Sequence, residues 1–172
     1  AIIRKAEPLV PGATQAVLGE GPVGATLAFV GEQPGDQEDL KGRPFVGPAG
    51  MLFTRAAEEA GIDRGEAYVT NAVNHFKFTL CGKRRIHEKP TAGEVSHYRW
   101  WLDKELELVG PKLVVALGAT AARALLGRNV RLSEQRGKVM DAIQASLQRD
   151  AKQYGATIVD VRIKHADLPD GS

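Results

Sequence analysis

The sequence predicts an α/β fold: a three-layer α/β/α arrangement around a central, mainly parallel sheet. Three short apolar runs alternate with segments whose apolar residues recur at helical spacing. This βαβαβα order is typical of a parallel sheet with helices packed on it. A length of 172 residues suits one domain with a single core. We therefore expect residues 1–172 to form a single domain.

The elements are predicted from local signals. Three prolines and four glycines make residues 1–25 an irregular lead-in. Thr91 and Glu94 form a capping box, T-x-x-E, that starts a helix. The elements expected after the lead-in are strand 26–31, loop 31–48, helix 49–61 with Met51, Leu52, Ala56 and Ala60 at helical spacing, strand 67–73, basic loop 75–90, helix 91–109, strand 112–118 and helix 119–127.

Charge is unevenly distributed along the chain. The net charge is only +2, yet six cations face two anions between His75 and Arg99. This local excess favours an anionic partner at one face. The single cysteine, Cys81, excludes an internal disulfide, and no CxxC pair is present to hold zinc or an iron–sulfur cluster. No metal site is therefore expected.

The apolar runs do not approach the roughly 20 residues that a membrane span requires. The first twelve residues lack the apolar core of a signal peptide. We expect a cytoplasmic monomer that does not associate with membranes.

The loop 31–48 follows a predicted strand and is rich in acids. Carboxylates at the carboxyl end of a strand can polarise a water or stabilise a cationic transition state, although a solvated turn is an equal alternative. Phe45 in the same loop could stack on a base or anchor the core. The loop's polar residues are Glu32, Gln33, Asp36, Glu38 and Asp39.

Asn71 and the stretch GKRRIHEKP are the other candidates. Asn71, at a strand end, has the donors and acceptor that read a nucleobase edge, although an asparagine that closes a turn is more common. In GKRRIHEKP, glycine and proline are expected to exclude regular structure. The run favours a patch for a nucleic-acid backbone, and catalysis by His87 is the less common case. Its cations are Lys83, Arg84, Arg85 and Lys89.

Parallel sheets bind ligands beyond the carboxyl ends of their strands. The loops at 31–48, 71–90 and 118–120 all follow predicted strands. We therefore expect them to meet at one crevice.

Four stretches in order resemble the UdgX-type uracil-DNA glycosylases, a branch of the uracil-DNA glycosylase superfamily close to its family 4. They are GEQPGDQEDLKGRPFVGPAG, YVTNAVNHFKF, GKRRIHEKP and LGATAARALLG, and the resemblance covers roughly residues 13–139. KRRIH is the hallmark of the UdgX branch. The resemblance implies an enzyme that excises uracil from DNA, single-stranded or flipped, and then stays bound through the histidine.

The resemblance also implies residue roles. His87 would be the nucleophile captured by the deoxyribose C1′. Gln33 and Asp36 would activate water and contact uracil, with Glu32 and Asp39 supporting that geometry. Phe45 would stack on the flipped uracil and Asn71 would read its edge. Arg85 would help to place the basic loop, and with Lys83, Arg84 and Lys89 it would complete the DNA-binding cations.

The chain departs from the family in three respects. It has no His-Pro-Ser motif, and His165 in KHADLP is not a match. The family holds an iron–sulfur cluster with cysteines, but the residues near those positions here are Arg4, Glu7 and Tyr98. No cofactor is therefore expected. Residues 137–172 resemble instead a segment of stomatin/prohibitin-like protease modulators. They are interpreted as an atypical helix–strand unit, natural or grafted. These departures leave a second hypothesis, a DNA-binding protein without turnover.

Overall fold

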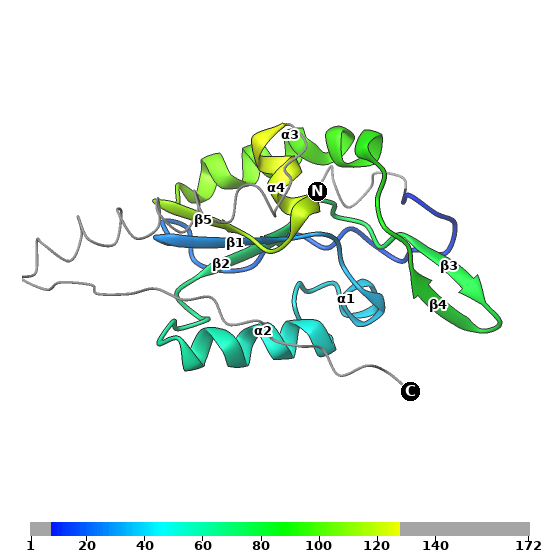
Figure 1. Ribbon diagram of the computed structural model, residues 1–172, viewed down its shortest axis with the longest axis horizontal. Helices are drawn as coiled ribbons and strands as arrows, with labels where there is room; N and C mark the ends of the chain where they lie inside the picture. Colours follow the sequence, from blue (N-terminus) through cyan, green and yellow to red (C-terminus); the bar gives the residue numbers. More distant parts are fainter. Residues whose placement is uncertain (1–7, 128–172) are drawn as a thin grey trace, which may run out of the picture. The chain divides into compact units, whose positions relative to one another are not determined.

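The computed structural model describes residues 8–127, which form a parallel sheet covered by helices on both faces (Figure 1). The sheet has three strands in the order β2-β1-β5. Helices α3 and α4 lie on one face, and α1 and α2 on the other. The predicted α/β/α architecture is therefore confirmed. The strands are β1 (Leu27–Gly31), β2 (Tyr68–Asn71) and β5 (Leu113–Ala116); the helices are α1 (Asp36–Lys41), α2 (Pro48–Glu59), α3 (Ala92–Val109) and α4 (Ala119–Leu126).

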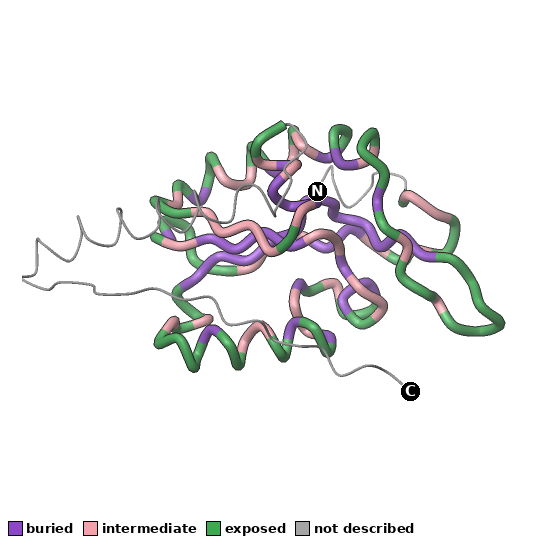
Figure 2. The backbone as a smooth tube through the Cα atoms, viewed as in Figure 1, coloured by how far each residue is buried: buried purple, intermediate pink, exposed green. Residues whose placement is uncertain are grey.

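Alternating side chains of β1 separate the two cores. Val30 belongs to a fully buried cluster with residues of α3 and α4. Phe29 points to the other side, where its ring meets Phe53 of α2 edge-on at 4.8 Å. Because both faces of the strand are covered, β1 is a nearly continuous apolar run, as in other buried parallel strands. Figure 2 shows this burial along the sheet.

The ends of α3 follow the sequence signals. The Thr91 hydroxyl accepts from the Glu94 amide, and the Glu94 carboxylate accepts from the Thr91 amide, which confirms the capping box. Gly110 ends the helix in the left-handed region, at φ 65°. Of the two tryptophans, Trp101 packs against the core and Trp100 is exposed.

The helical spacing of Met51 and Leu52 does not identify the buried face of α2. Met51 and Leu52 are exposed, whereas Gly50 and Ala57 are buried. A side chain at Gly50 would clash with the backbone of Phe45, so this face of the helix lies tightly against the preceding loop. Close backbone approach, which hydrophobicity does not report, decides which face is buried.

Two segments expected to be loops contain regular structure. Helix α1 lies within 31–48, and its residue Glu38 accepts from the amides of Gly35 and Gly47, the N-caps of α1 and α2. The basic segment is a β-hairpin of β3 (Phe78–Cys81) and β4 (Arg84–His87). Gly82 turns it with φ 60°, as a short hairpin loop requires. Glycine here makes a strand pair possible rather than preventing one.

The remaining sequence predictions concern the chain ends. Residues 8–25 are irregular apart from a bridge between Glu20 and Val69. The predictions for 137–172 lie outside the described residues. Between residues 8 and 127, no helix is both long and apolar enough to cross a bilayer.

Candidate active site

The side chains of Glu32 and His87 contact each other beyond the carboxyl ends of the strands. Glu32 follows β1 directly, and its Oε1 lies 3.1 Å from Nε2 of His87 on β4. Its second oxygen, Oε2, accepts a hydrogen bond from the hydroxyl of Thr120, in the first turn of α4. The loops that follow β1, β2 and β5 therefore meet, as the sequence predicts.

This pairing sets the chemistry available to His87. A carboxylate facing Nε2 favours a proton on that nitrogen. The neutral ring then keeps a lone pair on its other nitrogen. The His87 side chain is half exposed and Glu32 is 28% exposed, so an incoming molecule can reach the imidazole. The pair can act as a nucleophile with an attached base.

Asn71 and Phe45 lie beside the same strand end. Asn71 is 4% exposed and pairs in register with Gly31. A Cβ on Gly31 would lie 2.5 Å from Asn71 Oδ1 and 2.9 Å from Phe45 Cζ, so both side chains approach the glycine. Because Gly31 has no side chain, the side chains of Asn71 and Phe45 have space at this position.

Phe45 anchors a core, which is one of the two roles left open by the sequence. Its ring packs against Phe53 at 5.0 Å, yet the residue is only partly buried. Among residues 8–127 it is the one non-glycine residue with positive φ, 57°. Such strain persists where the surrounding structure fixes it, often at binding sites. One side of Phe45 anchors a core, and the rest remains available for stacking.

The Gln33 side chain is hydrogen-bonded to the residues that flank the hairpin. Its Nε2 donates to the carbonyls of Lys77 and Glu88, each at 3.1 Å. Its Oε1 accepts from the Lys77 amide at 3.0 Å. Lys77 and Glu88 flank the hairpin, so the carboxamide is occupied in closing the hairpin base. Gln33 thereby positions His87, which directly precedes Glu88.

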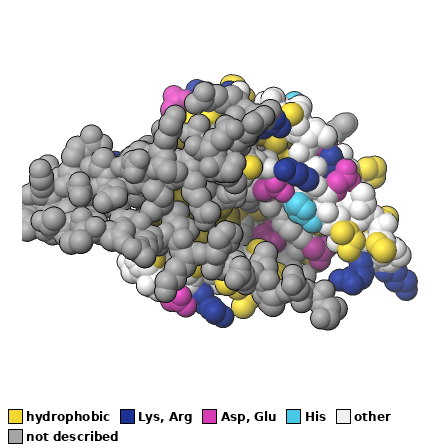
Figure 3. All heavy atoms as spheres, in the orientation of Figure 1, with side chains coloured by type: hydrophobic (Ala, Val, Ile, Leu, Met, Phe, Trp, Pro, Cys, Tyr) yellow, Lys and Arg dark blue, Asp and Glu magenta, His cyan; other side chains and the backbone are white. Residues whose placement is uncertain are grey.

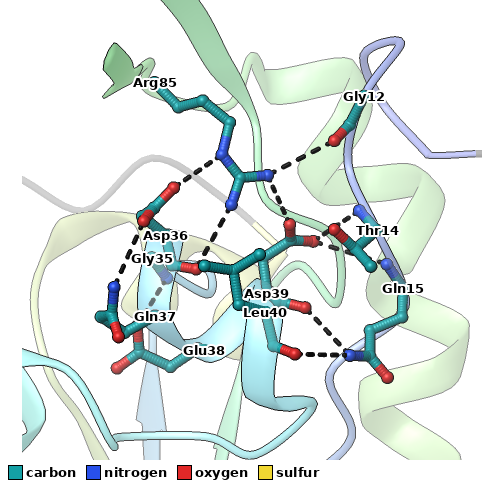
Figure 4. A network of polar contacts seen from close by, with 10 residues as sticks. All are labelled: Gly12, Thr14, Gln15, Gly35, Asp36, Gln37, Glu38, Asp39, Leu40 and Arg85. Atoms are coloured by element: carbon teal, nitrogen blue, oxygen red, sulfur yellow. Dashed lines mark hydrogen bonds and ion pairs between the residues drawn. The ribbon is translucent and has the colours of Figure 1, made fainter. Parts of the chain in front are cut away.

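The Arg85 side chain is also held by contacts within the protein (Figure 4). Its guanidinium lies 2.6 Å from carboxylate oxygens of both Asp36 and Asp39. Asp39 is fully buried and also accepts from the Thr14 amide at 2.9 Å. Burial alone would lower the pKa of Arg85, but hydrogen bonds to the two carboxylates outweigh it and the pKa is raised.

These contacts bear on two predicted site residues. The Arg85 side chain is only 15% exposed, and its guanidinium pairs with the carboxylates of Asp36 and Asp39. Asp36, expected to activate water, has its carboxylate against this guanidinium. The supporting role expected of Asp39 stays a prediction.

Not all of the six cations between His75 and Arg99 are exposed. Lys77 is 7% exposed and pairs with Glu94 at 3.0 Å and Glu88 at 3.3 Å. Its pKa is raised, chiefly by the hydrogen bond to Glu94. Of the predicted DNA-binding residues, three remain at the surface: Lys83, Arg84 and Lys89.

Known proteins resemble this chain over most of its length. Residues 18–161 match the family described as the uracil DNA glycosylase superfamily. The chain belongs to this superfamily. The match includes part of the segment 137–172, which was interpreted as atypical. The interpretation of 137–172 and membership of the UdgX branch remain predictions.

Relatives within the superfamily are identical to this chain at about a third of the aligned residues. A type-4 uracil-DNA glycosylase of Thermotoga maritima is 38% identical over 78% of this chain and 67% of its own length. Enzymes of the same name from Sulfurisphaera tokodaii and Archaeoglobus fulgidus are 35% and 36% identical, over 73% and 74% of this chain. The chain spans 56% and 63% of those two proteins.

The iron–sulfur cluster implied by the family resemblance does not fit this chain. A cluster is held by several cysteine thiolates, and the sequence has only Cys81, exposed at the end of β3. Tyr98, where a ligand is expected, is buried and lies 2.6 Å from Nδ1 of His75. Burial, with a smaller effect of Glu94, raises the pKa of Tyr98 to about 12. Within residues 8–127, no cluster of three or more His, Cys, Asp or Glu side chains could hold a metal ion.

Thr120 is the site residue that sequence reasoning missed. It is 6% exposed and holds the Glu32 carboxylate from α4. The sequence predicts a helix over residues 119–127 but assigns no role to Thr120. A threonine in the first turn of a helix that follows a strand could have indicated this contact.

Proposed function

We propose that this protein excises uracil from DNA. The Glu32–His87 pair carries the proposal, because it lies beside a strand end where Asn71 and Phe45 approach a bare glycine. A planar base stacked on Phe45 would present its edge to the Asn71 carboxamide. The names of the relatives support uracil as that base.

The bond between uracil and deoxyribose becomes reachable once the nucleotide leaves the base stack. Its cleavage gives an oxocarbenium-like sugar and a uracil anion. Glu32 offers a carboxylate near the positive sugar, and Asn71 offers amide donors to the anionic base. Asp36 and Asp39, which face Arg85, hold the hairpin in position instead.

We infer that His87 then captures the sugar. The electron pair of the C1′–N1 bond leaves with uracil, and the free imidazole lone pair forms a new bond to C1′. The imidazole proton passes to Glu32 and then to the uracil anion. The products are neutral uracil and deoxyribose linked to His87. The covalent adduct is the feature of the UdgX type.

A uracil-containing oligonucleotide tests both steps. Wild-type protein should release uracil and give a shifted band on a denaturing gel. His87→Ala should lose the band, whereas His97→Ala, which alters an exposed histidine of α3, should retain it. Uracil release without a wild-type adduct would remove the covalent step and leave the glycosylase.

A DNA-binding protein without turnover is the second candidate. The missing His-Pro-Ser motif and the exposed cations Lys83, Arg84 and Lys89 favour it. Wild-type protein that binds the oligonucleotide at low salt but releases no uracil would establish this candidate. In both cases binding should weaken steeply as salt rises.

We further propose that the partner is uracil-containing DNA, presented as a single strand or as a flipped nucleotide. A cytoplasmic monomer remains our proposal for the state of the protein. Sedimentation with and without the oligonucleotide tests the monomer.

A further inference from the structure

Lys77 is a buried lysine whose ammonium joins the end of the β3–β4 hairpin to the start of α3. Its side chain is 9% exposed, and Nζ lies 3.0 Å from Oε2 of Glu94 and 3.3 Å from Oε1 of Glu88. Glu88 directly follows His87 in the chain. A lysine is rarely buried unless its charge is paired, because the ammonium loses its hydration. The two carboxylates therefore hold Lys77 at this junction.

The Glu94 carboxylate is itself held in place. Its Oε2 also accepts a hydrogen bond from the Thr91 amide at 2.6 Å, as part of the capping box of α3. The helix packs into the main hydrophobic core through Val95, Tyr98 and Leu102. Lys77 therefore connects Glu88 to a helix that the core keeps fixed.

The strand register separates this junction from the proposed nucleophile. Phe78 pairs with His87, and directly beyond that pair the Glu88 amide donates to the Lys77 carbonyl at 3.0 Å. Successive side chains of a strand point to opposite faces, and opposite residues of a pair share a face. Figure 3 shows histidine, acidic and basic side chains close together on the surface near the hairpin. Lys77 and Glu88 thus lie on one face, and His87 lies on the other, against Glu32.

We propose that Lys77 is a positioning residue for His87 and favours capture of the sugar by the imidazole over capture by water. This inference rests on the proposed function and deepens its covalent step. Lys77 holds Glu88 toward α3, which fixes the backbone on the carboxyl side of His87 and keeps the ring against Glu32. The oxocarbenium-like sugar reacts with the nucleophile that is best placed, and a displacement of about 1 Å can change such a rate about a hundredfold.

The competing reaction gives a different product. Water adds its oxygen to C1′ and gives up a proton to the uracil anion, which leaves an abasic strand that is not attached to the protein. The ratio of adduct to free abasic DNA therefore measures how well His87 is placed. Both products arise from the folded protein, so a loss of stability does not change their ratio.

Variants of Lys77 test the proposal on a denaturing gel, with alkali to cut the strand at free abasic sites. Lys77→Met should lower the ratio of adduct to abasic DNA about ten- to hundredfold, and uracil release should fall less than about threefold. Lys77→Arg, which keeps a cation between the two carboxylates, should retain most of the ratio. Lys104→Met removes a half-exposed lysine that pairs with Glu107 within α3, and it should leave the ratio unchanged.

An NMR measurement tests the same positioning without DNA. Two-bond ¹H–¹⁵N spectra of the imidazole show which ring nitrogen carries the proton. His87 should carry it on Nε2 in the wild type, facing Glu32, and should give a mixture of the two tautomers in Lys77→Met. An unchanged product ratio or an unchanged tautomer in Lys77→Met overturns the proposal and leaves the glycosylase and its adduct standing. Uracil release without any wild-type adduct removes the covalent step itself, and this role of Lys77 with it.

Discussion

Replacing Arg85 by methionine tests whether this arginine supports the fold or contacts DNA. The substitution keeps a long, flexible side chain and removes the guanidinium. It leaves the fully buried Asp39 carboxylate without its cationic partner. Arg84, the preceding residue of β4, is exposed and offers a matched control.

The expected loss follows from the two ion pairs. Removing one partner of a buried pair costs about 3–5 kcal/mol because the other charge stays buried. Asp36 is 43% exposed and adds little to this, since water screens it. With a urea dependence of about 2 kcal/mol per M, the unfolding midpoint should fall by about 2 M. Arg84→Met should change the free energy of unfolding by no more than about 0.5 kcal/mol.

Urea unfolding followed by circular dichroism measures this difference. DNA binding as a function of salt gives the complementary result: Arg84→Met should reduce the salt slope by about one, and Arg85→Met, at temperatures where it is folded, should leave it unchanged. Equal midpoint shifts in the two variants would refute the structural role of Arg85. A reduced salt slope for Arg85→Met alone would indicate that Arg85 contacts DNA.

Three further outcomes are expected. Gly31→Ala should raise KM for uracil-DNA at least tenfold while the protein remains folded, because its Cβ would meet Asn71 and Phe45; unchanged steady-state kinetics would contradict this. Thr120→Val should lower kcat about tenfold with little effect on KM, since Glu32 loses a charge-assisted hydrogen bond, whereas Thr120→Ser should keep the rate. Burial lowers the pKa of His75 from 6.5, so the unfolded chain binds more protons. Stability should therefore fall as pH drops below about 6.5, by at most about 1.4 kcal/mol per pH unit, and urea unfolding of His75→Gln should show a weaker fall between pH 6.5 and 5.5.

The sequence by itself determined the order of the main elements, the capping box of α3 and the meeting of three loops at one strand edge. These follow from local chemistry: apolar runs, a threonine three residues before a glutamate, and the rule that parallel strands end on one side. The candidate site residues Glu32, Phe45, Asn71 and His87 could be named for the same reason, because each follows a strand or lies in a distinctive motif.

Only the tertiary structure decided which polar side chains remain free. Gln33, Asp36 and Arg85 had the right types for a reaction or for DNA, but residues 44 to 55 positions away in the sequence occupy them. Partners so distant are brought together by the sheet and the hairpin, and no local pattern records them. The same holds for Thr120 and Glu32, 88 positions apart. GKRRIHEKP was expected to be an irregular basic loop. Folding makes residues 84–87 a strand that largely covers Arg85, exposes Arg84 and places His87 against a carboxylate.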